Sequence, residues 1–80
     1  MTNEDRLPST RARANADTLT ALLGFDLVTE RRRREVTQQQ LAVLLGADKG
    51  TVSRWETGHT LPAAHHLLAL RSWLAAEAAA

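Results

Sequence analysis

The stretch TQQQLAVLLGADKGTVSRWETG, from Thr37 to Gly58, carries the start and stop signals of two short helices. Gly46 and Gly58 stand where helices end, and glycine is the usual residue just past a helix C-terminus. Thr37 and Asp48 stand where helices begin, because their side chains accept hydrogen bonds from the first free N–H groups of a helix. We therefore expect helices over residues 38–45 and 49–57, joined by three residues.

The two segments also show internal helical signals. In the first segment the leucines fall on one face, and Thr37 with Gln40 has the spacing of a capping box. In the second segment Val52 shares the inward side with Trp55 or Glu56. The first of these two helices has only about eight residues.

The flanking residues predict further helices. Four leucines recur at helical spacing and indicate a helix from about residue 17 to residue 34, capped by Asp17 or Thr18: Leu19, Leu22, Leu23 and Leu27. Gly24 either kinks this segment or separates a short first helix from it. Pro62 stands at or near the first turn of a last helix rich in leucine and alanine. Residues 1–16 are polar and are expected to form a mobile arm.

The composition agrees with a small all-α protein. The 80 residues form one domain, and only Phe25, Trp55 and Trp73 are aromatic, so the core must be mostly aliphatic. The chain has no cysteine, which excludes disulfides and cysteine-based metal sites. No apolar run is long enough to span a membrane, and we expect a soluble, cytoplasmic protein. The net charge of +1 argues weakly against a nucleic-acid binder, but the distribution of charge matters more.

Two short helices joined by three residues have the layout of a helix-turn-helix, here residues 38–57. In such a unit the second helix places its first residues against base edges in the major groove of DNA. The exposed side of residues 49–57 would carry Lys49, Gly50, Ser53 and Arg54. Arginine favours guanine through a bidentate contact, so these residues are the candidates for reading bases.

The residues from Leu27 to Leu74 resemble the lambda-repressor-like (Xre/Cro-type) helix-turn-helix family. The resemblance is carried by Thr-Gln, Leu-Ala, Leu-Gly, Thr-Val-Ser and Trp-Glu-x-Gly, which occur in this order from Thr37 to Gly58, and by Pro62 with the leucines after it. It implies an all-α, lambda-repressor-like bundle of four to five helices that binds double-stranded DNA.

The resemblance also implies roles for single residues. Gln38 and Thr51 match positions that contact phosphates, and Thr57 and His59 belong to a loop that follows the DNA backbone. Arg31 matches an arginine of the first helix that pairs with a glutamate at position 56, so Glu56 is expected to be structural.

The sequence departs from the family pattern at four positions. Glu35 replaces a common glycine, Glu30 a common leucine, and Ala47 a common valine or isoleucine. Gly50 removes one base-reading side chain. It is either a weak spot in the first turn or a place where the helix approaches DNA closely.

The other basic residues have less defined roles. Arg34 is placed to reach a phosphate, whereas Arg32 and Arg33 are expected to be solvated. Arg11 and Arg13 lie in the expected arm, which either has no role or enters the minor groove.

No residues predict catalysis or a cofactor. The chain shows no nucleophile with a base, no paired carboxylates and no phosphate-binding glycine loop. His59, His65 and His66 are not expected to bind a metal ion, because adjacent histidines on a helix point apart and no acidic residue or cysteine completes a site.

The sequence therefore favours a DNA-binding transcriptional regulator of the repressor or Cro type, without enzymatic activity, with residues 49–57 as its recognition helix. One alternative is an antitoxin that uses the same domain, with the arm or the end of the last helix blocking a toxin. Another is a protein-interaction module that has lost DNA binding. A homodimer is possible, because the surplus leucines of the last helix either pack on the leucines of residues 19–23 or form an interface.

Overall fold

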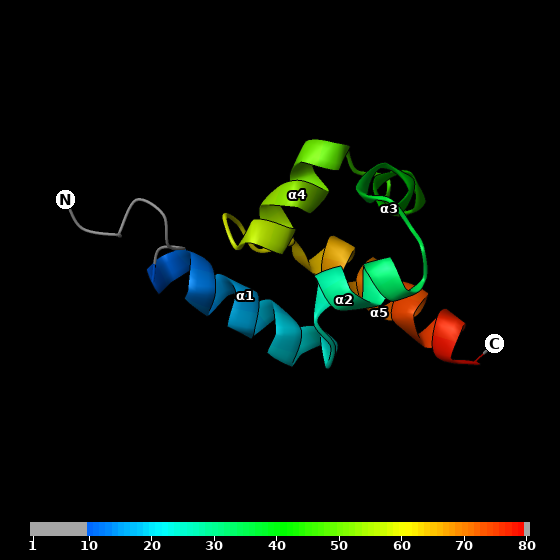
Figure 1. Ribbon diagram of the computed structural model, residues 1–80, viewed down its shortest axis with the longest axis horizontal. Helices are drawn as coiled ribbons and strands as arrows, with labels where there is room; N and C mark the ends of the chain where they lie inside the picture. Colours follow the sequence, from blue (N-terminus) through cyan, green and yellow to red (C-terminus); the bar gives the residue numbers. More distant parts are fainter. Residues whose placement is uncertain (1–9, 80) are drawn as a thin grey trace.

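The computed structural model describes residues 10–79, with side chains up to residue 76. In this range the chain forms five helices and no strand: α1 (Thr10–Leu23), α2 (Leu27–Arg33), α3 (Gln38–Leu45), α4 (Lys49–Thr57) and α5 (Ala64–Ala79). The all-α fold expected from the sequence is confirmed. Figure 1 shows α3 and α4 beside each other at one end of the view, with α2 and α5 packed below them.

The helix-turn-helix unit has the expected bounds. Thr37 and Gln40 form a reciprocal capping box, in which the Gln40 N–H donates to Thr37 Oγ1 at 3.0 Å and the Thr37 N–H donates to Gln40 Oε1 at 2.8 Å. Gly46 ends α3 with a φ of 69°, a left-handed conformation that glycine adopts at little cost. Asp48 caps α4, and Gly58 ends it. Local sequence signals thus set both ends of both helices.

The N-terminal part differs from the prediction. The described part of this helix begins at Thr10 rather than at Asp17 or Thr18, so residues 10–16 of the expected arm are helical. Residues 1–9 lie outside the described range. Alanine and arginine alternate in this segment, and both are strong helix formers. The segment also contacts the rest of the fold, since the Asn15 side-chain amide donates to the Gly58 carbonyl at 2.9 Å.

The helix is interrupted at Gly24, which has a φ of 81°. The single helix expected over residues 17–34 is therefore divided between α1 and α2. Asp26 then caps α2 by accepting from the Thr29 N–H at 3.0 Å. After α2, Glu35 takes a φ of 56°, a left-handed conformation that favours glycine, the residue that the resemblance leads us to expect at this position. The last helix, α5, begins at Ala64. Pro62, which was expected at or near its first turn, lies two residues before it.

The core lies where all five helices meet. Its buried side chains come from each helix: Leu19, Leu23, Leu27, Leu41, Ala42, Val52, Trp55, Leu70 and Leu74. Val52 and Trp55 are spaced three residues apart, so they point the same way and attach the inner side of α4 to this core. The opposite side of α4 is therefore left for solvent or a partner.

A buried ion pair joins α2 to α4. Arg31 Nε donates to Glu56 Oε2 at 2.6 Å, and Arg31 Nη2 donates to Glu56 Oε1 at 3.0 Å. The two side chains are only 10% and 6% exposed. The hydrogen bond to Glu56 raises the pKa of Arg31 above its ordinary value, although burial acts in the opposite direction. The expected structural pair is thus present with bidentate geometry.

The same pair reaches two further segments. Arg31 Nη1 donates to the Val36 carbonyl at 2.9 Å, and Gln38 Nε2 donates to Glu56 Oε1 at 2.9 Å. These bonds connect α2, the turn before α3, the start of α3 and the end of α4. The network therefore sets the position of the helix-turn-helix unit against α2.

We predict that Glu56→Ala lowers the free energy of unfolding by about 3–5 kcal/mol, because it leaves the Arg31 guanidinium buried without its partner. A domain of this size is stable by only about 4–12 kcal/mol, so the variant should unfold at much lower urea concentration. Urea titrations followed by tryptophan fluorescence measure the change.

Arg33→Ala is the matched control, since Arg33 pairs with Glu30 on the surface and its side chain is 63% exposed. Its loss should cost less than about 1 kcal/mol. Equal effects of the two substitutions would show that the buried pair is not what holds α4 to α2.

Candidate nucleic-acid interface

One side of α4 faces away from the core and carries the residues expected to read bases. Lys49, Gly50 and Arg54 are exposed, and Ser53 is half-buried. They fall on one side of the helix because residues four apart lie one above the other. Together with Thr57, which is also exposed, they form what we call the outer face of α4. The expected grouping of these residues is what the structure shows.

Gly50 lies beneath the side chain of Arg54. The Arg54 guanidinium folds back toward the start of α4, where Nη2 donates to Thr51 Oγ1 at 3.1 Å. A methyl group at residue 50 would lie 3.3 Å from Arg54 Nη1 and 3.3 Å from Asp48 Oδ1, both at the ends of flexible side chains. The backbone at Gly50 does not require glycine, so its absent side chain makes room on the outer face of α4.

Asp48 holds the first turn of this helix. Its carboxylate accepts from the Thr51 N–H at 2.7 Å. This hydrogen bond is the main reason why the pKa of Asp48 lies below its ordinary value, and the charge of Arg54 lowers it further. The ionised cap and the nearby guanidinium thus support each other at neutral pH.

The residues expected at phosphates fall into two groups. Thr57 and His59 are exposed at the end of α4 and in the loop after it. Thr51 is half-buried and accepts from Arg54, whereas Gln38 is half-buried and donates to Glu56. The side-chain amide of Gln38 therefore also has a structural role that the sequence did not reveal.

Arg34 does not fit the expected role of a phosphate contact. Its side chain is 6% exposed and binds Glu30, with Nη1 at 2.6 Å from Oε1. Its guanidinium also lies 5.2 Å from the ring centroid of Trp73, within the range of a cation–π interaction. Glu30, in turn, has a lowered pKa, first because of Arg33 and then because of Arg34. Burial between Glu30 and Trp73 withdraws Arg34 from the outer surface.

Arg11 and Arg13 are exposed residues of α1 rather than parts of an unstructured arm. Two helical residues apart, they point to different sides of the helix. Arg11 lines a cleft with Ala12 and the loop residues Gly58, His59 and Thr60. The sequence signal that could have placed them was the helix-forming run of alanine and arginine before Asp17.

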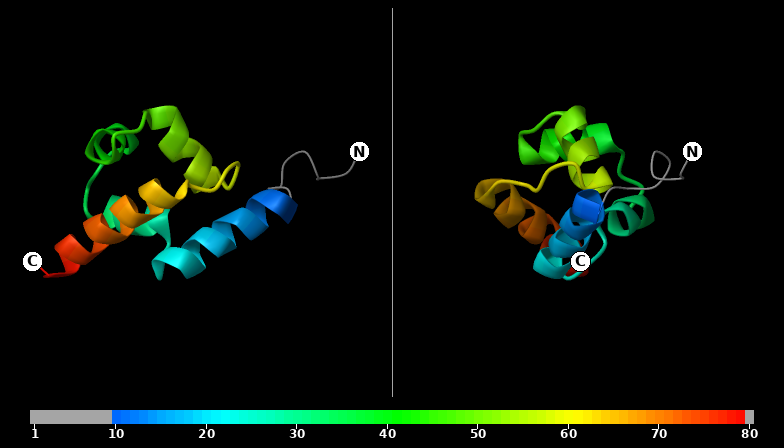
Figure 2. Two further views of the ribbon diagram at one scale, coloured as in Figure 1. Left: turned by 180° about the vertical axis from the view of Figure 1, so that it is seen from behind. Right: turned by 90° about the vertical axis from the view of Figure 1, so that its left-hand side faces the viewer.

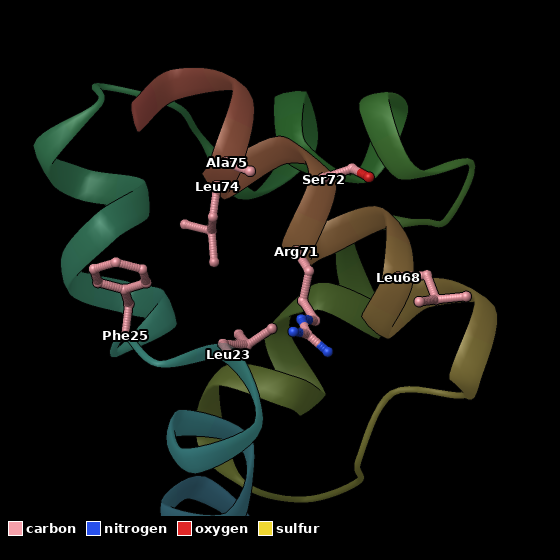
Figure 3. A pocket seen from close by; sticks show the side chains of 7 residues that line it. All are labelled: Leu23, Phe25, Leu68, Arg71, Ser72, Leu74 and Ala75. Carbon is pink, nitrogen blue, oxygen red and sulfur yellow. The ribbon is translucent and has the colours of Figure 1, made fainter. Parts of the chain in front are cut away.

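A second hollow lies between the end of α1 and α5. Leu23, Phe25, Leu68, Arg71, Ser72, Leu74 and Ala75 line it. Figure 3 shows the Arg71 guanidinium between Leu23 and Leu68, and the Ser72 hydroxyl pointing away from these side chains. No histidine or carboxylate lines this hollow, so Ser72 has no base beside it there.

The histidines of α5 lie close together instead of pointing apart. The ring centroids of His65 and His66 are 4.0 Å apart, and His66 lies 5.1 Å from Trp55. Within the part of the chain that the structure describes, no three histidine or acidic side chains are grouped as metal ligands. The helices of this part also lack the combined length and apolar character of a membrane span.

The chain matches the model of a known protein family. The family described as "Helix-turn-helix domain" matches residues 22–79, which is more than half of the chain. The matched range begins with the last two residues of α1 and contains α2 to α5. No curated protein and no solved structure matches the chain.

We predict that Gly50→Ala raises the free energy of unfolding, by at most about 1 kcal/mol, because alanine is the better helix former. If the outer face of α4 meets DNA closely, the same methyl group should weaken binding about five- to tenfold. Chemical unfolding and a fluorescence binding titration on the same variant measure both effects. If the variant is more stable and its affinity for DNA is unchanged, Gly50 only lowers the stability of α4 and has no role in binding.

The cap at Asp48 gives a prediction for pH. Its folded pKa is lowered, so its contribution to stability is full above the unfolded pKa of about 3.9 and is lost as pH falls through the folded value. Asparagine caps helices equally well and does not titrate. The stability of the wild type relative to Asp48→Asn should therefore decline below about pH 4. Parallel stability curves from pH 7 to pH 2 would contradict this account.

Proposed function

This chain belongs to the helix-turn-helix domain family, and we propose that it is a sequence-specific regulator of transcription that acts on double-stranded DNA in the cytoplasm, as a repressor of the Cro type and without enzymatic activity. The observation that supports this best is the outer face of α4. Two exposed cations, a hydroxyl and a bare backbone lie there on a helix whose opposite side is buried.

The chemistry of this face suits the major groove. Arg54 can donate two hydrogen bonds to guanine, and Lys49 can donate to the same acceptors from the first turn. The start of α4 also presents backbone N–H groups and the positive end of the helix dipole. We therefore propose that Lys49, Gly50, Ser53 and Arg54 face bases, whereas Thr51, Thr57 and His59 face phosphates.

Gln38 is proposed to contact a DNA phosphate, and it is also hydrogen-bonded to Glu56 of the buried ion pair. It stands at the start of α3, and its amide holds Glu56. A phosphate bound near Gln38 would thus be coupled to the buried ion pair. Arg34 has no part in the proposed interface, because Glu30 and Trp73 occupy it.

Protein interaction is a second candidate function, favoured by one observation. Val43 and Leu44 on α3 are 69% and 63% exposed, an unusual exposure for two neighbouring aliphatic side chains next to a candidate DNA-binding helix. The near-neutral net charge agrees with this candidate. The antitoxin stays an alternative prediction, and residues 10–16 of its candidate inhibitory arm form part of α1.

A homodimer stays a prediction. Two copies would read half-sites about one helical turn of DNA apart. A single copy would need an asymmetric site.

The proposed function is tested by selecting bound duplexes from a random pool and measuring their affinity at physiological salt. Lys49→Ala with Arg54→Ala should lower the affinity for the selected duplex at least about tenfold, since each good base contact contributes about 1–3 kcal/mol of discrimination. Arg71→Ala is the matched control, because it removes a cation from the hollow beside α5 instead (Figure 3). Unchanged affinity of the double variant would sink the proposal for α4.

A further inference from the structure

The start of α1 is seated on the loop that follows α4. Figures 1 and 2 show the first turn of α1 beside this loop from opposite sides. A Cβ atom at Gly58 would collide with the carbonyl of Ala12, so only glycine permits this approach. The Asn15 amide closes the contact by donating to the Gly58 carbonyl at 2.9 Å. With its φ of 80° and its burial, Gly58 is constrained both by the end of α4 and by α1.

The loop beneath α1 is itself attached to the candidate recognition helix. The backbone N–H groups of His59 and Thr60 both donate to the carbonyl of Arg54, at 2.8 Å and 3.3 Å. The loop is thus hydrogen-bonded to the backbone of Arg54, a residue that we place at bases. Anything docked on this loop is carried with α4 to the DNA.

The position of α1 places Arg11 at the cleft beside the loop after α4 and leaves Arg13 outside it. Arg11 lines the cleft together with Gly58, His59 and Thr60, and no carboxylate lines it. Arg13 is also exposed but lies about 200° further around the helix, and it does not line the cleft. A guanidinium, an imidazole and a hydroxyl therefore gather beside the end of α4.

We propose that Arg11, His59 and Thr60 form a phosphate-binding site for the DNA backbone, which the docking of α1 on Gly58 assembles. This inference rests on the proposed function and adds to it a contact that the helix-turn-helix unit alone does not provide. The guanidinium binds phosphate oxygens in a bidentate manner, and the hydroxyl and the ring N–H are further donors. Such a contact positions the protein along the duplex and carries no sequence information of its own.

This site differs from a flexible basic arm in a measurable way. An arm would use Arg11 and Arg13 alike, because neither would be held in place. A docked helix uses Arg11 alone. It also makes the contact depend on Asn15, although Asn15 itself need not touch DNA.

The test compares Arg11→Ala with Arg13→Ala, two variants with the same change of charge on the same helix. The slope of log affinity against log salt should become shallower by about 0.9 for Arg11→Ala, the value for one lost phosphate contact, and should stay unchanged for Arg13→Ala. The affinity of Arg11→Ala should fall by the same factor on selected and on unrelated duplexes. Asn15→Ala should shift the slope in the same direction as Arg11→Ala.

Three results would overturn the site. These are an unchanged slope for Arg11→Ala, an equal change for Arg13→Ala, or a loss confined to the selected duplex. Because Arg11 and Arg13 are exposed, circular dichroism should show both variants folded. If the wild type binds no duplex at all, the proposed function fails. If binding depends on Arg54 but Arg11→Ala leaves the salt slope unchanged, only the Arg11 contact fails.

Discussion

The buried ion pair between Arg31 and Glu56 is the interaction on which the arrangement of this domain depends. Each charge is almost removed from water, and each is satisfied by more than its partner: Arg31 also binds the Val36 carbonyl, and Glu56 also accepts from Gln38. A hydrophobic pair could fill the same space, but it would not define one relative position for four segments. Here the ion pair and its further hydrogen bonds fix the two short helices, α3 and α4, against α2. The geometry of the outer face of α4 is therefore decided on the opposite side of this helix.

The parts of the fold that were predicted well are those governed by local chemistry. Thr37 with Gln40, Asp48 and the two glycines after α3 and α4 define helix ends through bonds that span only a few residues, and such bonds can be read from the sequence. The start of α1 was predicted wrongly because its signals are of another kind. Propensity alone did not distinguish a helix from a polar arm, and the contact that holds the segment, between Ala12 and Gly58, joins residues far apart in the chain.

The same distinction separates the site residues. The outer face of α4 follows from helical spacing once the inward side is known, so Lys49, Gly50, Ser53 and Arg54 could be grouped in advance. Arg34 could not be placed, because its burial depends on Glu30 one turn earlier and on Trp73 from another helix. The two arginines of α1 could not be told apart either, since only the docked helix gives them different surroundings. The sequence alone does not show which basic residue is buried, which lines a cleft and which faces solvent, because tertiary contacts decide this.

The left-handed backbone at Glu35 has a consequence for how this domain can change. A side chain with a Cβ atom costs roughly 1–2 kcal/mol in that conformation, and glycine would avoid this cost while making the unfolded chain more flexible. The free energy of unfolding is thus lower than it would be with an unstrained residue in the turn between α2 and α3. Replacement by glycine there would leave the outer face of α4 untouched and would widen the range of mutations that the rest of the domain can tolerate. The number of substitutions that the outer face of α4 can tolerate is in this sense limited in part by a residue that lies outside this face.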